Sequence, residues 1–87
     1  MKVREFFHDE SRWIKHGFLK QDEKGWKACL IGAIELCYRE KEVPGVIKKV
    51  RHYLLSEESY YSYLEDWNDL PATKFKQIQK LIKTLDI

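Results

Sequence analysis

Hydrophobic residues recur at helical spacing over most of this chain, and the pattern predicts several short helices. Val3, Phe6 and Phe7 fall at positions i, i+3 and i+4 and predict a helix over 2–8. The longest predicted helix covers 26–39, and its apolar stripe consists of Cys29, Leu30, Ala33, Ile34 and Cys37. Gly32 within that helix indicates that a neighbouring helix or a tryptophan ring approaches closely.

The second half of the chain predicts further helices. Apolar residues at helical spacing cover 46–55, and the same spacing continues from Tyr60 to Trp67, with Ser56 as the expected N-cap residue. We expect Thr73 to cap the last helix. Its stripe is the clearest in the chain and consists of Phe75, Ile78, Leu81, Ile82 and Leu85.

The segment between the first two predicted helices has an irregular pattern. Gly17 and the string Asp22-Glu23-Lys24-Gly25 are turn signals, so a small β-hairpin near 17–27 is left open. Four to five short helices otherwise account for the chain. The expected fold is therefore all-α, a compact helical bundle that forms a single domain over 1–87.

Composition is that of a small globular domain. The chain has 87 residues, of which 44 % are hydrophobic and 34 % charged, enough for one modest core. No apolar stretch approaches the ~20 residues of a membrane span, and the N-terminus lacks the apolar run of a signal peptide, so we expect a cytoplasmic protein without membrane contact. Cys29 and Cys37 lie too far apart along one predicted helix to form a disulfide, and we expect reduced thiols.

Charge is segregated along the second half of the chain. Segment 43–55 contains Lys48, Lys49 and Arg51 but no acid, whereas segment 56–70 contains five acids and no lysine or arginine. The last predicted helix carries further lysines on one face, where we expect solvent. The net charge of only +2 and the neighbouring acids argue against nucleic-acid binding, which needs many unopposed cations.

The sequence contains no motif for catalysis or for a bound cofactor. Nucleophile-elbow, phosphate-loop, dinucleotide-binding and zinc-protease motifs are all absent. The three histidines, His8, His16 and His52, do not show the short ligand spacings of zinc sites. We therefore expect a protein that is not an enzyme, with no catalytic residue, no metal and no cofactor.

The most unusual local string is Trp67-Asn68-Asp69-Leu70-Pro71-Ala72-Thr73. Asn and Asp bond their own backbone in turns, Pro prevents helix continuation, and Thr accepts an amide hydrogen bond at a helix start. One interpretation is an ordered corner between helices that Trp67 holds against the core. The other is a site in which Asn68 and Asp69 present polar groups beside an aromatic wall to a small ligand or a peptide.

Three strings together resemble a family found mainly in bacteria and their phages, domain of unknown function 6197. They are Trp13-Ile14-Lys15-His16-Gly17, Cys29-Leu30-Ile31-Gly32-Ala33-Ile34 and the string from Trp67 to Thr73. The resemblance extends from about Trp13 to Leu85. It implies a small, mostly helical, intracellular bacterial or phage domain, with no assigned reaction or cofactor. It also implies one framework made of Trp13, Cys29, Gly32, Trp67, Asn68, Asp69 and Thr73.

These observations favour a non-enzymatic binding or regulatory module that acts on a bacterial protein partner, such as a phage-type inhibitor or accessory factor. The alternative is a small-ligand binder or sensor, in which Trp13, Trp26 or Trp67 stacks on a nucleotide-like base. Tyr60, Tyr61 and Tyr63 crowd one predicted helix, so Tyr60 and Tyr61 are candidate partner contacts, and a homo-oligomer through this segment is left open. The full candidate set is Trp13, Trp26, Tyr60, Tyr61, Trp67, Asn68, Asp69 and Thr73.

Overall fold

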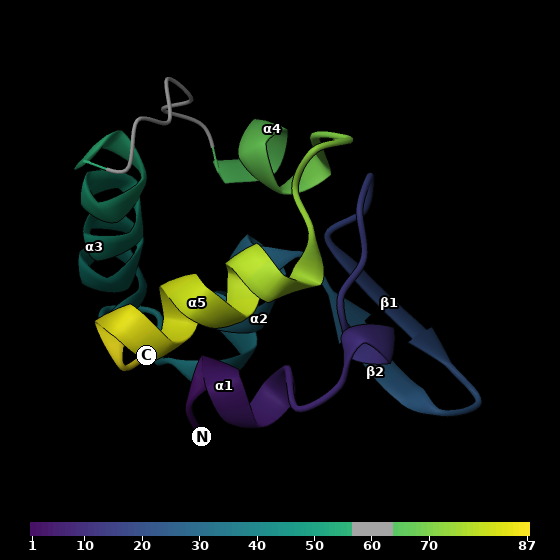
Figure 1. Ribbon diagram of the computed structural model, residues 1–87. Helices are drawn as coiled ribbons and strands as arrows, with labels where there is room; N and C mark the ends of the chain where they lie inside the picture. The colour runs from purple at the N-terminus through teal and green to yellow at the C-terminus, as the bar shows by residue number, and fades with distance from the viewer. Residues whose placement is uncertain (57–63) are drawn as a thin grey trace.

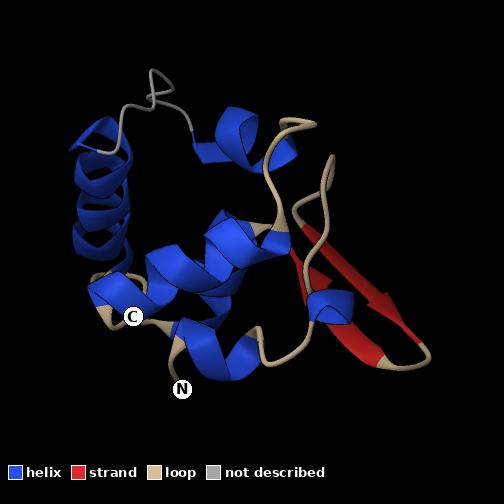
Figure 2. Cartoon of the chain, viewed as in Figure 1, coloured by secondary structure: helices blue, strands red, loops and turns tan. Residues whose placement is uncertain are grey.

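The computed structural model describes residues 1–56 and 64–87 (Figure 1), and within them it contains both helices and a hairpin. The helices are α1 Val3–Phe6, α2 Leu30–Cys37, α3 Val43–Ser56, α4 Leu64–Asp69 and α5 Phe75–Leu85, with a short 3-10 helix η1 at Glu10–Arg12. The strands are β1 Leu19–Asp22 and β2 Gly25–Ala28, which form one antiparallel sheet (Figure 2). The expected all-α bundle is thus corrected to a helix-rich mixed fold.

Helix α2 lies at the centre of the molecule, in contact with α1, α3, α4 and β2. Its residues Leu30, Ala33 and Ile34 have no exposed surface, so the predicted stripe is indeed the buried face. Helix α5 lies in front of α2 in Figure 1, contacts α1 and α3, and buries Ile78 and Leu81 completely. One core therefore joins the first and last helices through the central one.

The hairpin near 17–27 is present, and it shortens the predicted central helix. Leu19 pairs with Ala28 and Asp22 pairs with Gly25, so Trp26 lies in a strand and α2 begins only at Leu30. Gly25 has a φ of 112°, a backbone conformation that favours glycine. The prediction of a helix over 26–39 was wrong in its first turn because tertiary pairing overrode the helical spacing of the apolar residues.

Gly32 accommodates the chain just before β1, and neither a helix nor a tryptophan ring is its closest neighbour. A Cβ atom at Gly32 would lie 2.3 Å from the backbone carbonyl oxygen of Phe18. That carbonyl also accepts a hydrogen bond from the Cys29 amide, with a nitrogen–oxygen distance of 3.1 Å. Gly32 is therefore needed because the base of the hairpin packs directly on the first turn of α2.

The start of α5 differs from the prediction by one residue. Lys74, and not Thr73, is the N-cap residue, and its amide donates to Gln77 Oε1 at 2.6 Å. The Thr73 hydroxyl instead donates to the Trp67 carbonyl oxygen at 2.6 Å and is buried. Ser56, the expected N-cap residue, lies within α3, and the helical spacing predicted from Tyr60 falls partly outside the described residues, in which α4 covers Leu64–Asp69.

The two ends of the chain lie near each other (Figure 1), and ion pairs join them. Asp86 forms ion pairs with Lys2 at 3.0 Å and with Arg4 at 2.7 Å. The hydrogen bond and charge of Lys2, followed by the charge of Arg4, lower the pKa of the Asp86 carboxyl. None of the helices in the described ranges is long and apolar enough to cross a bilayer.

Candidate functional site

Asn68 is a buried structural hub at the end of α4. Its Oδ1 accepts hydrogen bonds from Trp13 Nε1 at 2.7 Å and from the Leu30 amide at 3.1 Å. Its Nδ2 donates to the Ile14 carbonyl oxygen and to Asp69 Oδ1, both at 3.0 Å. With 1 % of its surface exposed and both amide atoms bonded, Asn68 holds three distant segments together and presents no free polar group to a ligand.

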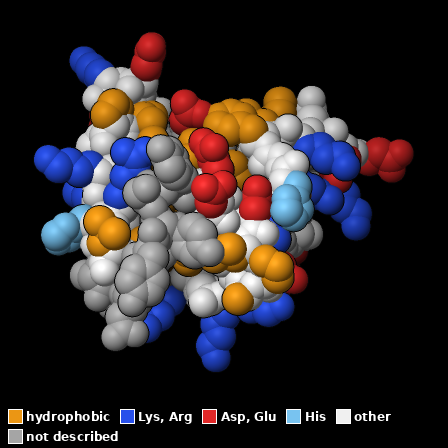
Figure 3. Space-filling view, turned by 90° about the horizontal axis from the view of Figure 1, so that it is seen from above, with side chains coloured by type: hydrophobic (Ala, Val, Ile, Leu, Met, Phe, Trp, Pro, Cys, Tyr) orange, Lys and Arg blue, Asp and Glu red, His pale blue; other side chains and the backbone are white. Residues whose placement is uncertain are grey.

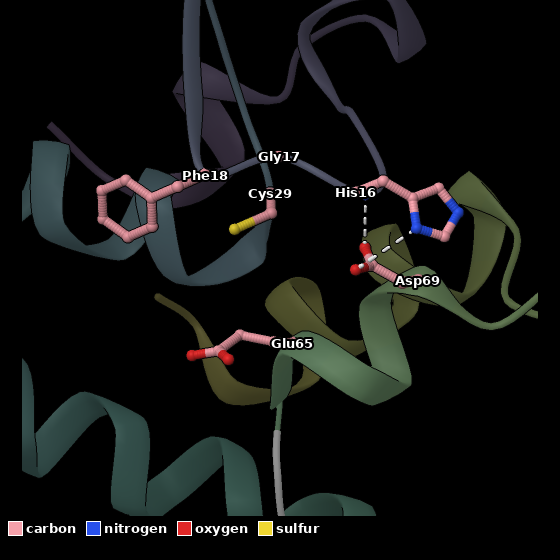
Figure 4. A pocket seen from close by; sticks show the side chains of 6 residues that line it. All are labelled: His16, Gly17, Phe18, Cys29, Glu65 and Asp69. Atoms are coloured by element: carbon pink, nitrogen blue, oxygen red, sulfur yellow. Dashed lines mark hydrogen bonds and ion pairs between the residues drawn. The ribbon is translucent and has the colours of Figure 1, made fainter.

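Asp69 fixes the loop that leads into the hairpin. Its Oδ1 accepts the His16 amide at 2.8 Å, and its Oδ2 lies 3.7 Å from His16 Nδ1 (Figure 4). His16 has a φ of 60°, which a non-glycine residue adopts only when the surroundings hold it there. The bond from its amide to Asp69 is one such restraint. Asp69 keeps 29 % of its side chain exposed, so it also faces solvent.

The two aromatic residues of this framework are used inside the fold. Trp67 is buried, with 8 % of its surface exposed, and its carbonyl accepts the Thr73 hydroxyl. The Trp13 ring lies 6.0 Å from that of Phe75, and its indole nitrogen is bonded to Asn68. Trp67 and Thr73 therefore form an ordered corner between α4 and α5, as the structural interpretation predicts.

A pocket of about 610 Å³ lies beside the framework, between the base of the hairpin and α4 (Figure 4). Glu65 and Asp69 line one side of it from α4, where residues four apart share a helix face. Phe18, directly before β1, and Cys29, directly after β2, line the other side. Figure 3 shows acidic side chains gathered near the middle of one face of the molecule, beside a histidine and hydrophobic side chains. We call this cavity, lined by His16, Gly17, Phe18, Cys29, Glu65 and Asp69, the acidic pocket.

The acidic pocket carries negative charge that lysine and arginine do not neutralise. Among the described residues, neither Glu65 nor Asp69 forms an ion pair with a lysine or an arginine, and segment 57–63 contains neither residue type. The nearby Lys15 ammonium instead donates to the Leu70 carbonyl oxygen and lies 5.4 Å from the centre of the Trp13 ring. Phe18 is 46 % exposed at the pocket wall. The pocket thus combines two carboxylates with an apolar surface.

Cys29 lies in the acidic pocket as the N-cap residue of α2 and not within the helix. Its sulfur accepts the Gly32 amide at 3.4 Å, and the residue is 3 % exposed. Burial raises the pKa of the Cys29 thiol despite this bond, which favours the protonated and unreactive form. In Figure 4 its sulfur points away from the His16 ring, so the two do not form a nucleophile–base pair. Both cysteines are free thiols.

The remaining candidates lie elsewhere. Trp26 is 45 % exposed and lines a separate cavity of about 250 Å³ with Phe6 and Arg12. Tyr60 and Tyr61 lie outside the described residues, so their roles stay predictions. In the described part of the chain, no group of three or more histidine, cysteine or acidic side chains could hold a metal ion.

Of the residues that line the acidic pocket, only Asp69 was a candidate site residue from the sequence. Glu65 could have been found, because it lies four residues before Asp69 and the two carboxylates share a helix face. Phe18 and His16 gave no such signal, because their positions depend on the contact of the loop with α2 and α4.

Comparison with known proteins adds no relative: no family model, no curated protein and no solved structure matches this chain. The resemblance to domain of unknown function 6197 therefore stays a prediction.

Proposed function

We propose that this protein is a non-enzymatic binding module whose acidic pocket receives a lysine or arginine side chain of a protein partner. The observation that carries the proposal is the pairing of Glu65 and Asp69 with the exposed ring of Phe18 around a cavity of about 610 Å³. A basic side chain has an aliphatic stem and a cationic head, which suit an apolar wall and two carboxylates.

A regulatory role, as a phage-type inhibitor or accessory factor of a bacterial protein, is consistent with this proposal. The protonated state that burial favours for Cys29 argues for binding rather than nucleophilic chemistry at the pocket. The free thiols of Cys29 and Cys37 support a cytoplasmic location. Membership of domain of unknown function 6197 is part of the same proposal.

The test is affinity capture from a bacterial lysate with wild-type protein, Glu65→Gln and Asp66→Asn, followed by quantitative mass spectrometry. Glu65 is exposed and lines the pocket, whereas Asp66 is the next exposed acid on the same helix and does not line it. Loss of one charge-assisted hydrogen bond costs about 1.5–3 kcal/mol, so Glu65→Gln should weaken recovery of the partner at least about tenfold. Asp66→Asn should recover the same proteins as wild type. Equal recovery by wild type and both variants would count against the pocket as the contact.

A second candidate function is small-ligand binding at Trp26. Its half-exposed ring and the Arg12 guanidinium line the same cavity of about 250 Å³, an arrangement suited to a stacked base with an anionic group. Trp13 and Trp67 are engaged in the fold, which leaves Trp26 as the one exposed tryptophan in the described chain. Native mass spectrometry of gently purified protein tests this candidate, because a retained ligand adds mass that is lost on denaturation.

A further inference from the structure

The two outer edges of the hairpin are not equivalent. On the outer edge of β2, the Trp26 carbonyl oxygen accepts a hydrogen bond from Arg12 Nη1 at 3.1 Å. The next outward carbonyl, that of Ala28, accepts the Ile14 amide at 3.0 Å. The chain before the hairpin thus covers the β2 edge with its own donors.

The outer edge of β1 has no such cover. The bond from the Cys29 amide to Phe18 makes these two residues a hydrogen-bonded pair, and such pairs alternate along an antiparallel ladder. Lys20 and Asp22 therefore bond inward to β2, and the amide and carbonyl groups of Leu19 and Gln21 point outward. Within the described ranges, none of these four outward groups has a hydrogen-bond partner. An open strand edge of this kind is a template for another strand.

The open edge is continuous with the acidic pocket. Phe18 lines the pocket and is followed directly by Leu19, the first residue of β1. An extended segment bonded along β1 would therefore reach the pocket at the base of the hairpin. There its side chain would meet Phe18 and the two carboxylates, Glu65 and Asp69.

A second copy of this chain is a poor occupant of the edge. Antiparallel pairing of two β1 strands through all their outward groups would place Leu19 opposite Gln21 and Lys20 directly opposite its equivalent. Like charges directly opposite each other destabilise a pair of strands. The lysine thus opposes self-pairing but leaves the edge open to a segment without a basic residue at the facing position.

We propose that an extended segment of the protein partner adds to the edge of β1 as a third strand and places a lysine or arginine side chain in the acidic pocket. Strand addition of this kind takes affinity from main-chain hydrogen bonds and specificity from a side-chain pocket. This inference rests on the proposed function, because the acidic pocket is the reason for expecting a basic residue in the added segment. What it adds is the mode of binding, and strand addition can prove wrong while the contact of a basic side chain with the pocket is still correct.

The test uses short linear peptides selected from an unbiased display library against the immobilised wild-type protein, then synthesised with a fluorophore. Their affinities are measured by fluorescence anisotropy for wild type, Gln21→Pro, Gln21→Ala and Glu65→Gln. Of the backbone hydrogen-bonding groups, proline at this position removes only the outward amide, since Gln21 does not bond to β2. Edge strands tolerate a proline whose amide side faces solvent. Gln21→Ala removes the same side chain but keeps the amide, so it is the matched control.

The proposal expects selected peptides with a lysine or arginine and at least a tenfold loss of affinity in Gln21→Pro, with Gln21→Ala unchanged. Glu65→Gln should also lose at least tenfold. Wild-type affinity in Gln21→Pro would overturn strand addition, while a retained loss in Glu65→Gln would leave the proposed function standing. Binding that is insensitive to Glu65→Gln, or a library that yields no binder, would count against the proposed function as well.

Circular dichroism shows whether Gln21→Pro keeps its fold. If it does not, amide hydrogen exchange of the wild-type protein gives the answer. Strand addition must slow the exchange of the Leu19 and Gln21 amides when the peptide is bound, and unchanged exchange at both positions would overturn it.

Discussion

Replacing Gly32 by alanine tests the close approach on which the acidic pocket depends. The added Cβ would lie 2.3 Å from the Phe18 carbonyl oxygen and 3.2 Å from the Ala28 side chain. The first of these neighbours is backbone, and its hydrogen bond from Cys29 holds it in place. The hairpin base must therefore move by about 1 Å, because a carbon and an oxygen do not approach much closer than ~3 Å without repulsion.

The expected cost follows from three contributions. Overpacking of this kind costs about 1–3 kcal/mol, and loss of the bond between Cys29 and Phe18 adds about 0.5–1.5 kcal/mol. Alanine offsets about 1 kcal/mol of this through its better helix propensity. We expect Gly32→Ala to lower the free energy of unfolding by about 2 kcal/mol, which corresponds to a fall in Tm of about 8–16 °C for a domain of this size.

Gly45→Ala is the matched control. Gly45 is also helical, in α3, but a Cβ atom there would meet nothing within 4 Å. The same substitution should raise the free energy of unfolding by about 0.5 kcal/mol, through helix propensity and the smaller freedom of the unfolded chain. Urea unfolding followed by far-UV circular dichroism measures both variants. If Gly32→Ala proves as stable as wild type, the packing of the hairpin base on α2 is not as described.

Three further predictions concern the framework and the charged surface. Asn68→Ala should lower the free energy of unfolding by about 3 kcal/mol, because it leaves several buried groups without hydrogen-bond partners. Gln79→Ala, on an exposed helix face, is its control and should change the free energy of unfolding by less than about 0.5 kcal/mol in the same urea experiment. Trp67→Ala should lower the free energy of unfolding by about 3–5 kcal/mol, and Trp26→Ala should lower it much less, because Trp67 is buried and Trp26 is exposed. Comparable decreases for the two variants, measured by urea unfolding followed by circular dichroism, would contradict this difference in burial. The lowered pKa of Asp86 means that its contribution is present above the unfolded-state pKa and lost as pH falls through the folded-state pKa. Asp86→Asn should therefore lower Tm at neutral pH and leave it unchanged below the folded-state pKa, and an equal effect at both pH values would contradict an ionic role.

Local spacing predicted most of the helical core. Ile78, Leu81 and Ile82 of α5 are buried as their stripe indicates, and so are Val50 and Leu54 of α3. These residues lie on the face of their own helix that packs against the core, and the spacing of apolar residues in the sequence is enough to identify that face.

The errors lie where distant parts of the chain decide the structure. Trp26 continues the apolar spacing of α2 but lies in a strand, because Ala28 pairs with Leu19 and with the chain at Trp13. The hydrogen bonds of Asn68 could not be predicted from local spacing, since Trp13 is 55 residues away and Leu30 is 38 residues away. The string from Trp67 to Thr73 indicated the corner, and only the family resemblance grouped Trp13 with Asn68.

Three separate segments of the chain form the wall of the acidic pocket, so binding at the pocket is coupled to the stability of the whole fold. Its residues come from the 16–18 loop, from Cys29 and from α4, segments that are distant in the sequence and that the hydrogen bonds of Asn68 and Asp69 join in the folded chain. A partner that recognises the pocket therefore binds the native chain and not its unfolded form. By mass action, such a partner at a hundred times its Kd adds about 2.7 kcal/mol of stability. A rise in Tm on addition of a candidate thus detects binding to the native protein, and loss of that rise in Glu65→Gln assigns the binding to the pocket.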